Sequence, residues 1–333
     1  MLVKDLGKHD PSLEVVKGAD FQINRPADTK SAQDHTFLFV KNNKFLAPAL
    51  EAASKHKIAL VIDKKLNESL DTPIDGQVEA LITTTDVNIS MSLLSKAFHD
   101  EIYTERNMAV DGRQMGTCDI HPTVWIAQGV FIGDNVKLGE NVKIHPGVVL
   151  MGDITIGANT EIFPNVSIYQ NVEIGERTRI HAGVVIGGDG FGYNFKDGVH
   201  HKVWHFGGVR IGNDVEIGCN STVDQGTFSP TIICDMVKLD NVVHIAHNSY
   251  IGKGVIFCGQ AATAGSATVG DYTVLGGKAG IAPGVVVGPG SEIAGLGQVT
   301  TDFPAGSKIG GHPGRPIKEW LRGIAWVRKN SAK

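Results

Sequence analysis

The segment that decides the fold is residues 120–150, "IHPTVWIAQGVFIGDNVKLGENVKIHPGVVL", in which Ile or Leu returns at every sixth position. This six-residue repeat continues, with two interruptions, as far as Val299. Of its 27 positions, 25 are Ile, Leu or Val, and the exceptions are Phe257 and Thr263. A repeat sustained over this length predicts an architecture built from stacked, similar units.

A period of six fits neither an α-helix nor the two-residue alternation of a single strand. It fits short strands joined by turns into a three-sided coil, in which each repeat residue points into a triangular core. The small residues beside the repeat, in stretches such as "GDN", "GEN" and "GAN", suit the corners. We therefore expect a left-handed parallel β-helix of the hexapeptide type, with coils of about 18 residues stacked ~4.8 Å apart.

Two further regions flank the expected β-helix, which we place at residues 106–305. Residues 1–105 alternate strand-like runs ("HTFLFV", "IALVID", "EALITTT") with helix-like ones, and they predict a small α/β domain. Within it, the stretch "KFLAPALEAASKH" would bring Phe45, Ala49, Leu50 and Ala53 onto one side of a helix. Residues 306–333 predict a C-terminal helical segment, because "PIKEWLRGIAWVRK" has apolar residues at helical spacing. The expected fold is thus mainly β.

Composition narrows the class of protein. The formal net charge of −4 gives no basic footprint for nucleic acid. The start "MLVKDLGKHD" has no apolar signal region, and no run approaches the length of a transmembrane segment. The four cysteines have no CxxC spacing, so we expect reduced structural thiols. These features predict a soluble cytoplasmic protein.

The stretch "VVHIAHNSYIG" at residues 242–252 places His247 and Asn248 between two repeat positions. Acyl transfer from a thioester to an amine needs a base for the amine proton and donors for the oxyanion. Gly265 follows His247 by 18 residues, so the coil geometry should set it one coil above, with an open backbone N–H. A histidine that is merely hydrogen-bonded in a corner remains the alternative at this point.

Other chemistries of this fold have less support in the residues. Hexapeptide β-helices serve as acyltransferases, metal-dependent hydratases or scaffolds, so the fold alone leaves function open. A zinc site needs three converging imidazoles, whereas no histidine lies one coil away from His244 or His247. The run "GGDGFG" lacks the spacing of a dinucleotide fingerprint.

Several motifs together resemble a known family. "GGDGFGY" at 187–193, "TVDQGTFSPTII" at 222–233, "LDNVVHIAHNSYIG" at 239–252, "AGSATVG" at 264–270 and "GGHPGRPIKEWLR" at 310–322 closely resemble the UDP-3-O-(3-hydroxyacyl)glucosamine N-acyltransferases of lipid A synthesis. The resemblance covers essentially the whole chain, and the combination of the "GDGFGY" and "IAHN" motifs is specific to this family.

The resemblance implies an activity and its participants. A 3-hydroxyacyl chain would move from acyl carrier protein to the 2-amino group of UDP-3-O-acylglucosamine, without a metal or diffusible cofactor, in a cleft between the subunits of a homotrimer. His247 would be the general base, Asn248 its neighbour in the motif, and Gly265 the oxyanion-binding amide. A related N-acyltransferase that uses acyl-CoA or another UDP-amino sugar is the alternative, and a non-catalytic scaffold is a further one.

The resemblance also implies a nucleotide site in the N-terminal domain, where the family stacks uracil on an aromatic pair. Here "FVKNNKF" supplies Phe39, Asn42 and Phe45, with phenylalanine where the family has tyrosine. The chain departs from the family at two further positions. His244 stands where glutamine is frequent, and Gly284 stands where a second histidine of the family lies. We expect His244 to contact substrate and partly to compensate for that histidine.

Overall fold

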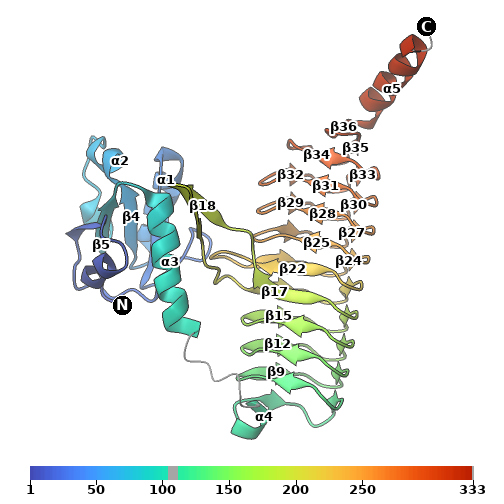
Figure 1. The fold of residues 1–333 in the computed structure, drawn as a ribbon, viewed down its shortest axis with the longest axis horizontal. Coiled ribbons are helices and arrows are strands. Elements are labelled where there is room, and N and C mark those ends of the chain that lie inside the picture. Colours follow the sequence, from blue (N-terminus) through green and yellow to red (C-terminus); the bar gives the residue numbers. More distant parts are fainter. Residues whose placement is uncertain (104–111, 332–333) are drawn as a thin grey trace. The chain divides into compact units, whose positions relative to one another are not determined.

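The computed structural model describes residues 1–103 and 112–331, which fall into two compact units (Figure 1). The first unit contains residues 1–106 together with 192–206 and 227–229. The second unit contains residues 107–191, 207–226 and 230–333. The domain boundary expected between residues 105 and 106 lies outside the described residues.

The first unit is built on a five-stranded sheet with the order β1-β5-β4-β3-β2. Its strands are β1 (Glu14–Lys17), β2 (Arg25–Pro26), β3 (Thr36–Val40), β4 (Ala59–Asp63) and β5 (Ala80–Thr84). The neighbours β2, β3, β4 and β5 are parallel, and β1 is antiparallel to β5. β3, β4 and β5 are the three strand-like runs of the sequence, and β4 and β5 are almost entirely buried, as parallel strands covered on both sides are.

Helices accompany these strands. They are the 3₁₀ helices η1 (Val3–Lys8) and η2 (Asp75–Gln77) and the α-helices α1 (Asn43–Lys55), α2 (Lys64–Glu68) and α3 (Val87–Tyr103). In α1, Ala49 and Ala52 are buried, whereas Phe45 is 39% exposed. Of the expected apolar side, Ala49 is buried, Leu50 and Ala53 are half-buried, and Phe45 remains accessible.

A hairpin from far along the chain completes the first unit. It consists of β18 (Tyr193–Lys196) and β19 (Val199–Lys202). The Asn194 side chain donates to Asn88 O at 2.6 Å and to Ser92 Oγ at 2.8 Å, so the hairpin is bound to α3. The sequence marked this stretch as an interruption of the repeat and did not indicate its partner.

The second unit is a left-handed parallel β-helix with three sheets, which we call the first, second and third faces in chain order (Figure 1). The first face holds β6 (Asp119–Ile120), β9 (Val136–Leu138), β12 (Ile154–Ile156), β15 (Val172–Ile174), β20 (Val209–Ile211), β23 (Thr231–Ile233), β26 (Tyr250–Ile251), β29 (Thr268–Val269) and β32 (Val286–Val287).

The second face is the longest. It holds β7 (Trp125–Ile126), β10 (Lys143–Ile144), β13 (Glu161–Ile162), β16 (Arg179–Ile180), β21 (Glu216–Ile217), β24 (Lys238–Leu239), β27 (Ile256–Phe257), β30 (Val274–Leu275), β33 (Glu292–Ile293), β35 (Lys308–Gly310) and β36 (Arg315–Pro316). The third face holds β8 (Phe131–Ile132), β11 (Val149–Leu150), β14 (Ser167–Ile168), β17 (Val185–Asp189), β22 (Thr222–Gln225), β25 (His244–Ile245), β28 (Ala262–Thr263), β31 (Gly280–Ile281) and β34 (Gln298–Val299). The short helix α4 (Gly112–Met115) precedes the first coil.

Register follows the repeat. Ile126 pairs with Ile144, and Ile144 with Ile162, as stacking of residues one coil apart requires. The repeat residues from Ile132 onward are buried, and Ile120 and Ile126 are partly buried against the same continuous core. Phe257 and Thr263 also have almost no exposed surface. The fold predicted from the six-residue repeat is confirmed.

Many corners have a left-handed backbone, at asparagines and also at Val242 and Leu296. Asn135 adopts φ 55° and Asn248 adopts φ 59°, a region that asparagine enters more easily than most side chains do. Two coils contain more than the usual 18 residues. This follows from the pairing of Ile180 with Ile217 and of Ile217 with Leu239. Both insertions leave the β-helix after a strand of the third face, β17 or β22.

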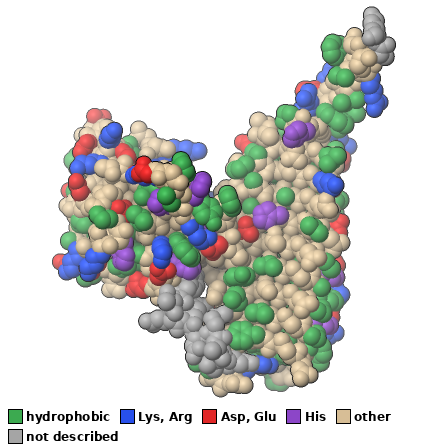
Figure 2. Space-filling model, in the orientation of Figure 1, with side chains coloured by type: hydrophobic (Ala, Val, Ile, Leu, Met, Phe, Trp, Pro, Cys, Tyr) green, Lys and Arg blue, Asp and Glu red, His purple; other side chains and the backbone are tan. Residues whose placement is uncertain are grey.

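The chain ends in helix α5 (Ile317–Ser331), as the sequence predicts. None of its residues is buried, and its first turn packs on β35 and β36. Lys and Arg side chains are prominent along this helix (Figure 2). No helix in the described part of the chain is long and apolar enough to cross a membrane. The cytoplasmic location stays a prediction.

Candidate active site

A cavity of about 920 Å³ lies against the third face of the β-helix. Strands β22, β25, β28, β31 and β34 supply its walls, in the coils that carry the "IAHN" motif. The residues that line it include Asp224, His244, His247, Gly265, Gly284 and Gln298. Four residues singled out in the sequence therefore line one cavity, although they span about 40 positions of the chain: His244, His247, Gly265 and Gly284.

Asn248 holds the imidazole of His247. The distance from His247 Nδ1 to Asn248 Oδ1 is 3.1 Å. An amide oxygen can only accept, so this pair places the proton on Nδ1 and makes Nε2 the acceptor nitrogen of the neutral ring. The Asn248 N–H donates to Thr231 Oγ1 at 2.9 Å, which fixes the corner. The side chain of Asn248 therefore sets the tautomer of His247, and its backbone N–H fixes the corner.

Gly265 lies directly against the ring of His247, as the coil geometry predicts. A Cβ built on Gly265 would be 2.5 Å from both Nε2 and Cε1 of that ring. Pro283 occupies the same position one coil further, so the stacking of coils makes no use of an N–H there. Among the described residues, none accepts a hydrogen bond from the Gly265 N–H. The glycine thus gives room to the imidazole and leaves a backbone donor beside it.

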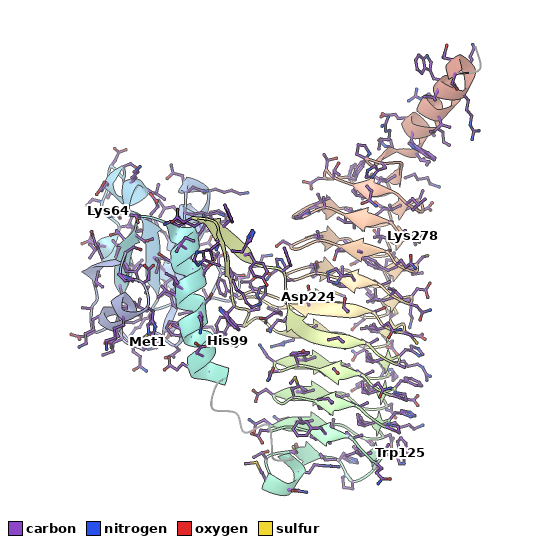
Figure 3. All side chains as sticks on the ribbon, viewed as in Figure 1. Met1, Lys64, His99, Trp125, Asp224 and Lys278 are labelled. Carbon is purple, nitrogen blue, oxygen red and sulfur yellow. The ribbon has the colours of Figure 1, made fainter. Side chains whose placement is uncertain are left out.

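His244 belongs to a second polar group in the same cavity. Its Nδ1 is 2.7 Å from Thr222 Oγ1, and its Nε2 is 3.7 Å from Asp224 Oδ2. Asp224 lies in β22 and is labelled in Figure 3. Burial, together with the nearby Asp189 carboxylate, raises the pKa of Asp224 to about 7. Burial and the proximity of His247 lower the pKa of His244.

Gly284 also lines the cavity, where the resemblance expects a histidine. Its φ is 71°, and a Cβ there would meet no atom within 4 Å. The side chain of a histidine would therefore have space, but its backbone would be strained. Around it the floor of the cavity is made of small residues: Ala246, Ala262, Ala264, Gly280 and Ala282.

A second cavity, of about 260 Å³, lies within the first unit. Phe39 from β3 and Phe45 from α1 both line it, as do Lys41 and Asn88. Asn42 does not belong to this lining. Its side chain accepts from the Lys44 N–H at 3.1 Å and caps α1, which begins at the next residue. Asn42 thus fixes the helix that presents Phe45.

Sequence reasoning missed two groups that line these cavities. Asp224 was part of a quoted motif, but its approach to His244 depends on a coil of unusual length, for which the repeat gives no register. Phe228 lines the cavity of the first unit although it follows Phe39 by almost 190 residues. The sequence signal that could have indicated Phe228 was an aromatic residue in a polar stretch where the six-residue repeat is interrupted.

Comparisons with known proteins agree with this architecture. The family model described as "Bacterial transferase hexapeptide (six repeats)" matches residues 117–152 and 153–188. The crystal structure of the Francisella novicida UDP-N-acetylglucosamine acyltransferase is similar with a TM-score of 0.50 and 26% identity, over 59% of this chain and 69% of that chain.

Two curated relatives have the same name. The UDP-3-O-acylglucosamine N-acyltransferase of Methylobacterium nodulans is 42% identical over 147 residues, which are 44% of this chain and 42% of that protein. The chain therefore matches less than half of the length of that relative. The UDP-3-O-acylglucosamine N-acyltransferase of Helicobacter hepaticus is 34% identical over 93% of this chain and 90% of that protein. With an alignment of that extent, the chain belongs to the UDP-3-O-acylglucosamine N-acyltransferase family.

Proposed function

We propose that this protein transfers a 3-hydroxyacyl chain from acyl carrier protein to the 2-amino group of UDP-3-O-acylglucosamine, with His247 as the general base. The observation that carries the proposal is the arrangement of His247, Asn248 and Gly265 in an open cavity. Aminolysis of a thioester needs a base for the amine proton and a hydrogen-bond donor for the oxyanion. His247 with its fixed tautomer and the Gly265 N–H supply these two groups.

The steps assign one role to each group. The amine nitrogen attacks the thioester carbonyl carbon, and His247 Nε2 takes the proton that the nitrogen loses. The oxyanion that forms accepts from the Gly265 N–H. The C–S bond then breaks, and the imidazolium returns the proton to the departing sulfur. The products are an amide and the free thiol of the carrier, and His247 ends in its starting state.

The surroundings support the choice of substrates. The small residues on the cavity floor leave the third face flat and mostly apolar, which suits an acyl chain. Phe39 and Phe45 offer ring surfaces to a uracil base, and Lys41 offers charge to a diphosphate. We further propose that three chains assemble and that the cavity lies in a cleft between neighbouring chains.

The test is mass spectrometry of the product formed from UDP-3-O-acylglucosamine and a mixture of 3-hydroxyacyl donors. The same acyl groups are offered on acyl carrier protein and on coenzyme A, with distinguishable isotopic labels. An N-acylated product that carries the label of the carrier protein supports the proposal. Preferential transfer from coenzyme A favours the alternative donor, and no transfer from either donor contradicts the proposed activity.

A further inference from the structure

Phe228 brings a third aromatic ring to the cavity of the first unit. It lies in the short segment 227–229, which belongs to that unit although the stretches on either side of it belong to the second unit. The rings of Phe39 and Phe228 are 6.1 Å apart between centroids and only 23° from parallel. Both residues line the cavity, and Phe45 lines it from α1.

The position of the Phe228 ring is determined by contacts within the first unit. Phe206 lies behind it, with a centroid distance of 6.3 Å and an angle of 29° between the rings. The Phe206 N–H donates to Thr227 O at 2.7 Å, which fixes the backbone next to the ring. Phe206 itself is buried in the core of the unit. The ring of Phe228 is therefore held against Phe206 and also lines the cavity.

A polar tether holds the other end of the segment. The hydroxyl of Ser229 donates to Asp28 Oδ1, which also accepts from the Lys30 N–H and the Ser31 N–H, each at 2.9 Å. Asp28 lines the cavity as well. One carboxylate oxygen thus organises the 28–31 loop and at the same time holds Phe228 in place.

We infer that Phe228 is a binding residue for the pyrimidine base of the nucleotide, with Ser229 and Asp28 as its positioning residues. The inference rests on the proposed function, which supplies the uridine ligand. Phe39 and Phe228 both bring aromatic rings to the cavity, and a planar base gains from stacking on an aromatic face. The volume of about 260 Å³ has room for one base.

The test measures UMP affinity by calorimetry for the full chain and for Phe228→Leu and Phe228→Tyr. Leucine keeps apolar volume but has no ring face, so we expect UMP affinity to fall at least about fivefold, as loss of base stacking does. Tyrosine keeps the ring face and should bind UMP within about twofold of wild type. Ser229→Ala should weaken UMP binding about two- to fivefold, because the segment then lacks its tether.

A second ligand separates stacking from packing. 5,6-Dihydro-UMP keeps the imide hydrogen-bonding groups of uracil but has a puckered, non-aromatic ring. If Phe228 stacks on the base, the difference between wild type and Phe228→Leu should largely disappear with this ligand. A penalty of equal size for UMP and dihydro-UMP would overturn the inference, because it would report a general distortion of the cavity. Thermal unfolding of each variant checks that the unit is intact.

Matched substitutions distinguish this inference from the proposed function. Phe21→Leu changes a phenylalanine that stacks on His35 outside the cavity lining, and it should leave UMP affinity unchanged. Phe39→Leu should weaken UMP binding. If it does while Phe228→Leu binds like wild type, the inference about Phe228 fails and the nucleotide site stands. If the wild-type protein does not bind UMP, both fail.

Discussion

At the scale of the residue, His247 depends on two neighbours that do different things. Asn248 accepts from Nδ1 and therefore makes Nε2 the nitrogen that can take up a proton as a base. Gly265 leaves the space into which the other side of the ring projects. Because both neighbours act on the same ring, substitutions at either should change turnover more than they change the binding of the nucleotide.

The Asn248 hydrogen bond can be removed without straining the corner. Glycine accepts the backbone of residue 248, whose φ is 59°, so Asn248→Gly deletes only the side chain. We expect turnover at saturating substrates to fall roughly 10- to 100-fold, because the favoured tautomer is lost. Asn248→Asp, which keeps an acceptor for Nδ1, should retain most activity. Equal rates for Asn248→Gly and wild type would contradict the assigned role.

Gly265→Ala tests the space beside the imidazole. The new Cβ would be 2.5 Å from two ring atoms, so the ring has to move. We expect turnover to fall about 10- to 100-fold, as for a catalytic group displaced by an ångström, with unchanged UMP affinity. Gly277→Ala is the matched control, since its Cβ would meet Gly259 O at an ordinary 3.5 Å. A loss of UMP binding in Gly265→Ala would indicate blockage of the cavity instead.

Asp224 predicts a pH dependence of stability. Its pKa is about 7 in the folded protein and 3.8 as an ordinary carboxyl, so the folded state holds the proton more tightly. The stabilisation from this proton is complete below pH 3.8 and is lost as the pH rises to about 7. The melting temperature of wild type relative to Asp224→Asn should therefore fall between about pH 4 and pH 7 and then level off.

His244 is a second titratable group near this site and needs a control. Its Nε2 lies 3.7 Å from Asp224 Oδ2, and its pKa is lowered. The comparison is repeated in the background of His244→Gln, where the change with pH should persist. A difference in melting temperature that stays constant from pH 4 to pH 9 would show that Asp224 is ionised throughout.

At the scale of the element, helix α5 combines an exposed apolar side with positive charge. Lys318 and Arg322 are exposed on it, and Leu321 and Trp326 are exposed as well. Glu319 is the acidic residue of its first turn. The proposed donor protein is strongly acidic, so a basic helix at the end of the β-helix would raise the rate at which the donor associates.

Reversing two charges tests this steering. For Lys318→Glu with Arg322→Glu, we expect the KM for the acyl-carrier donor to rise several-fold at low salt. The difference should shrink as salt rises, because screening at physiological ionic strength acts over about 8 Å. The KM for the UDP-sugar should not change. Donor kinetics equal to wild type from low to high salt would place carrier docking elsewhere.

At the scale of the whole molecule, the sequence predicted the β-helix well because this fold is nearly one-dimensional. Each coil contacts its neighbours in the stack, so Ile144 needs only Ile126 and Ile162 in register. A local repeat therefore contains the global arrangement. The strands of the α/β unit were predictable for a related reason, since β4 and β5 are continuous apolar runs.

The rest was not predictable because it depends on segments without a repeat. The β18–β19 hairpin and Phe228 leave the β-helix and join the first unit through contacts such as Asn194 with Ser92, which no periodicity encodes. The cavity with His247 and Gly265 was predictable, since the 18-residue coil sets their register. The pairing of Asp224 with His244 was not, because the coil between Ile217 and Leu239 is longer.

The central claim is that His247 is the general base, and the most direct measurement is the rate of N-acyl transfer by His247→Ala at saturating donor and UDP-3-O-acylglucosamine. Sedimentation should first show that this variant and wild type share one oligomeric mass, expected to be about three times 35.5 kDa. We expect a rate about 10²–10⁴-fold below wild type, with unchanged UMP affinity. A folded variant that keeps more than about a third of the wild-type rate would contradict it.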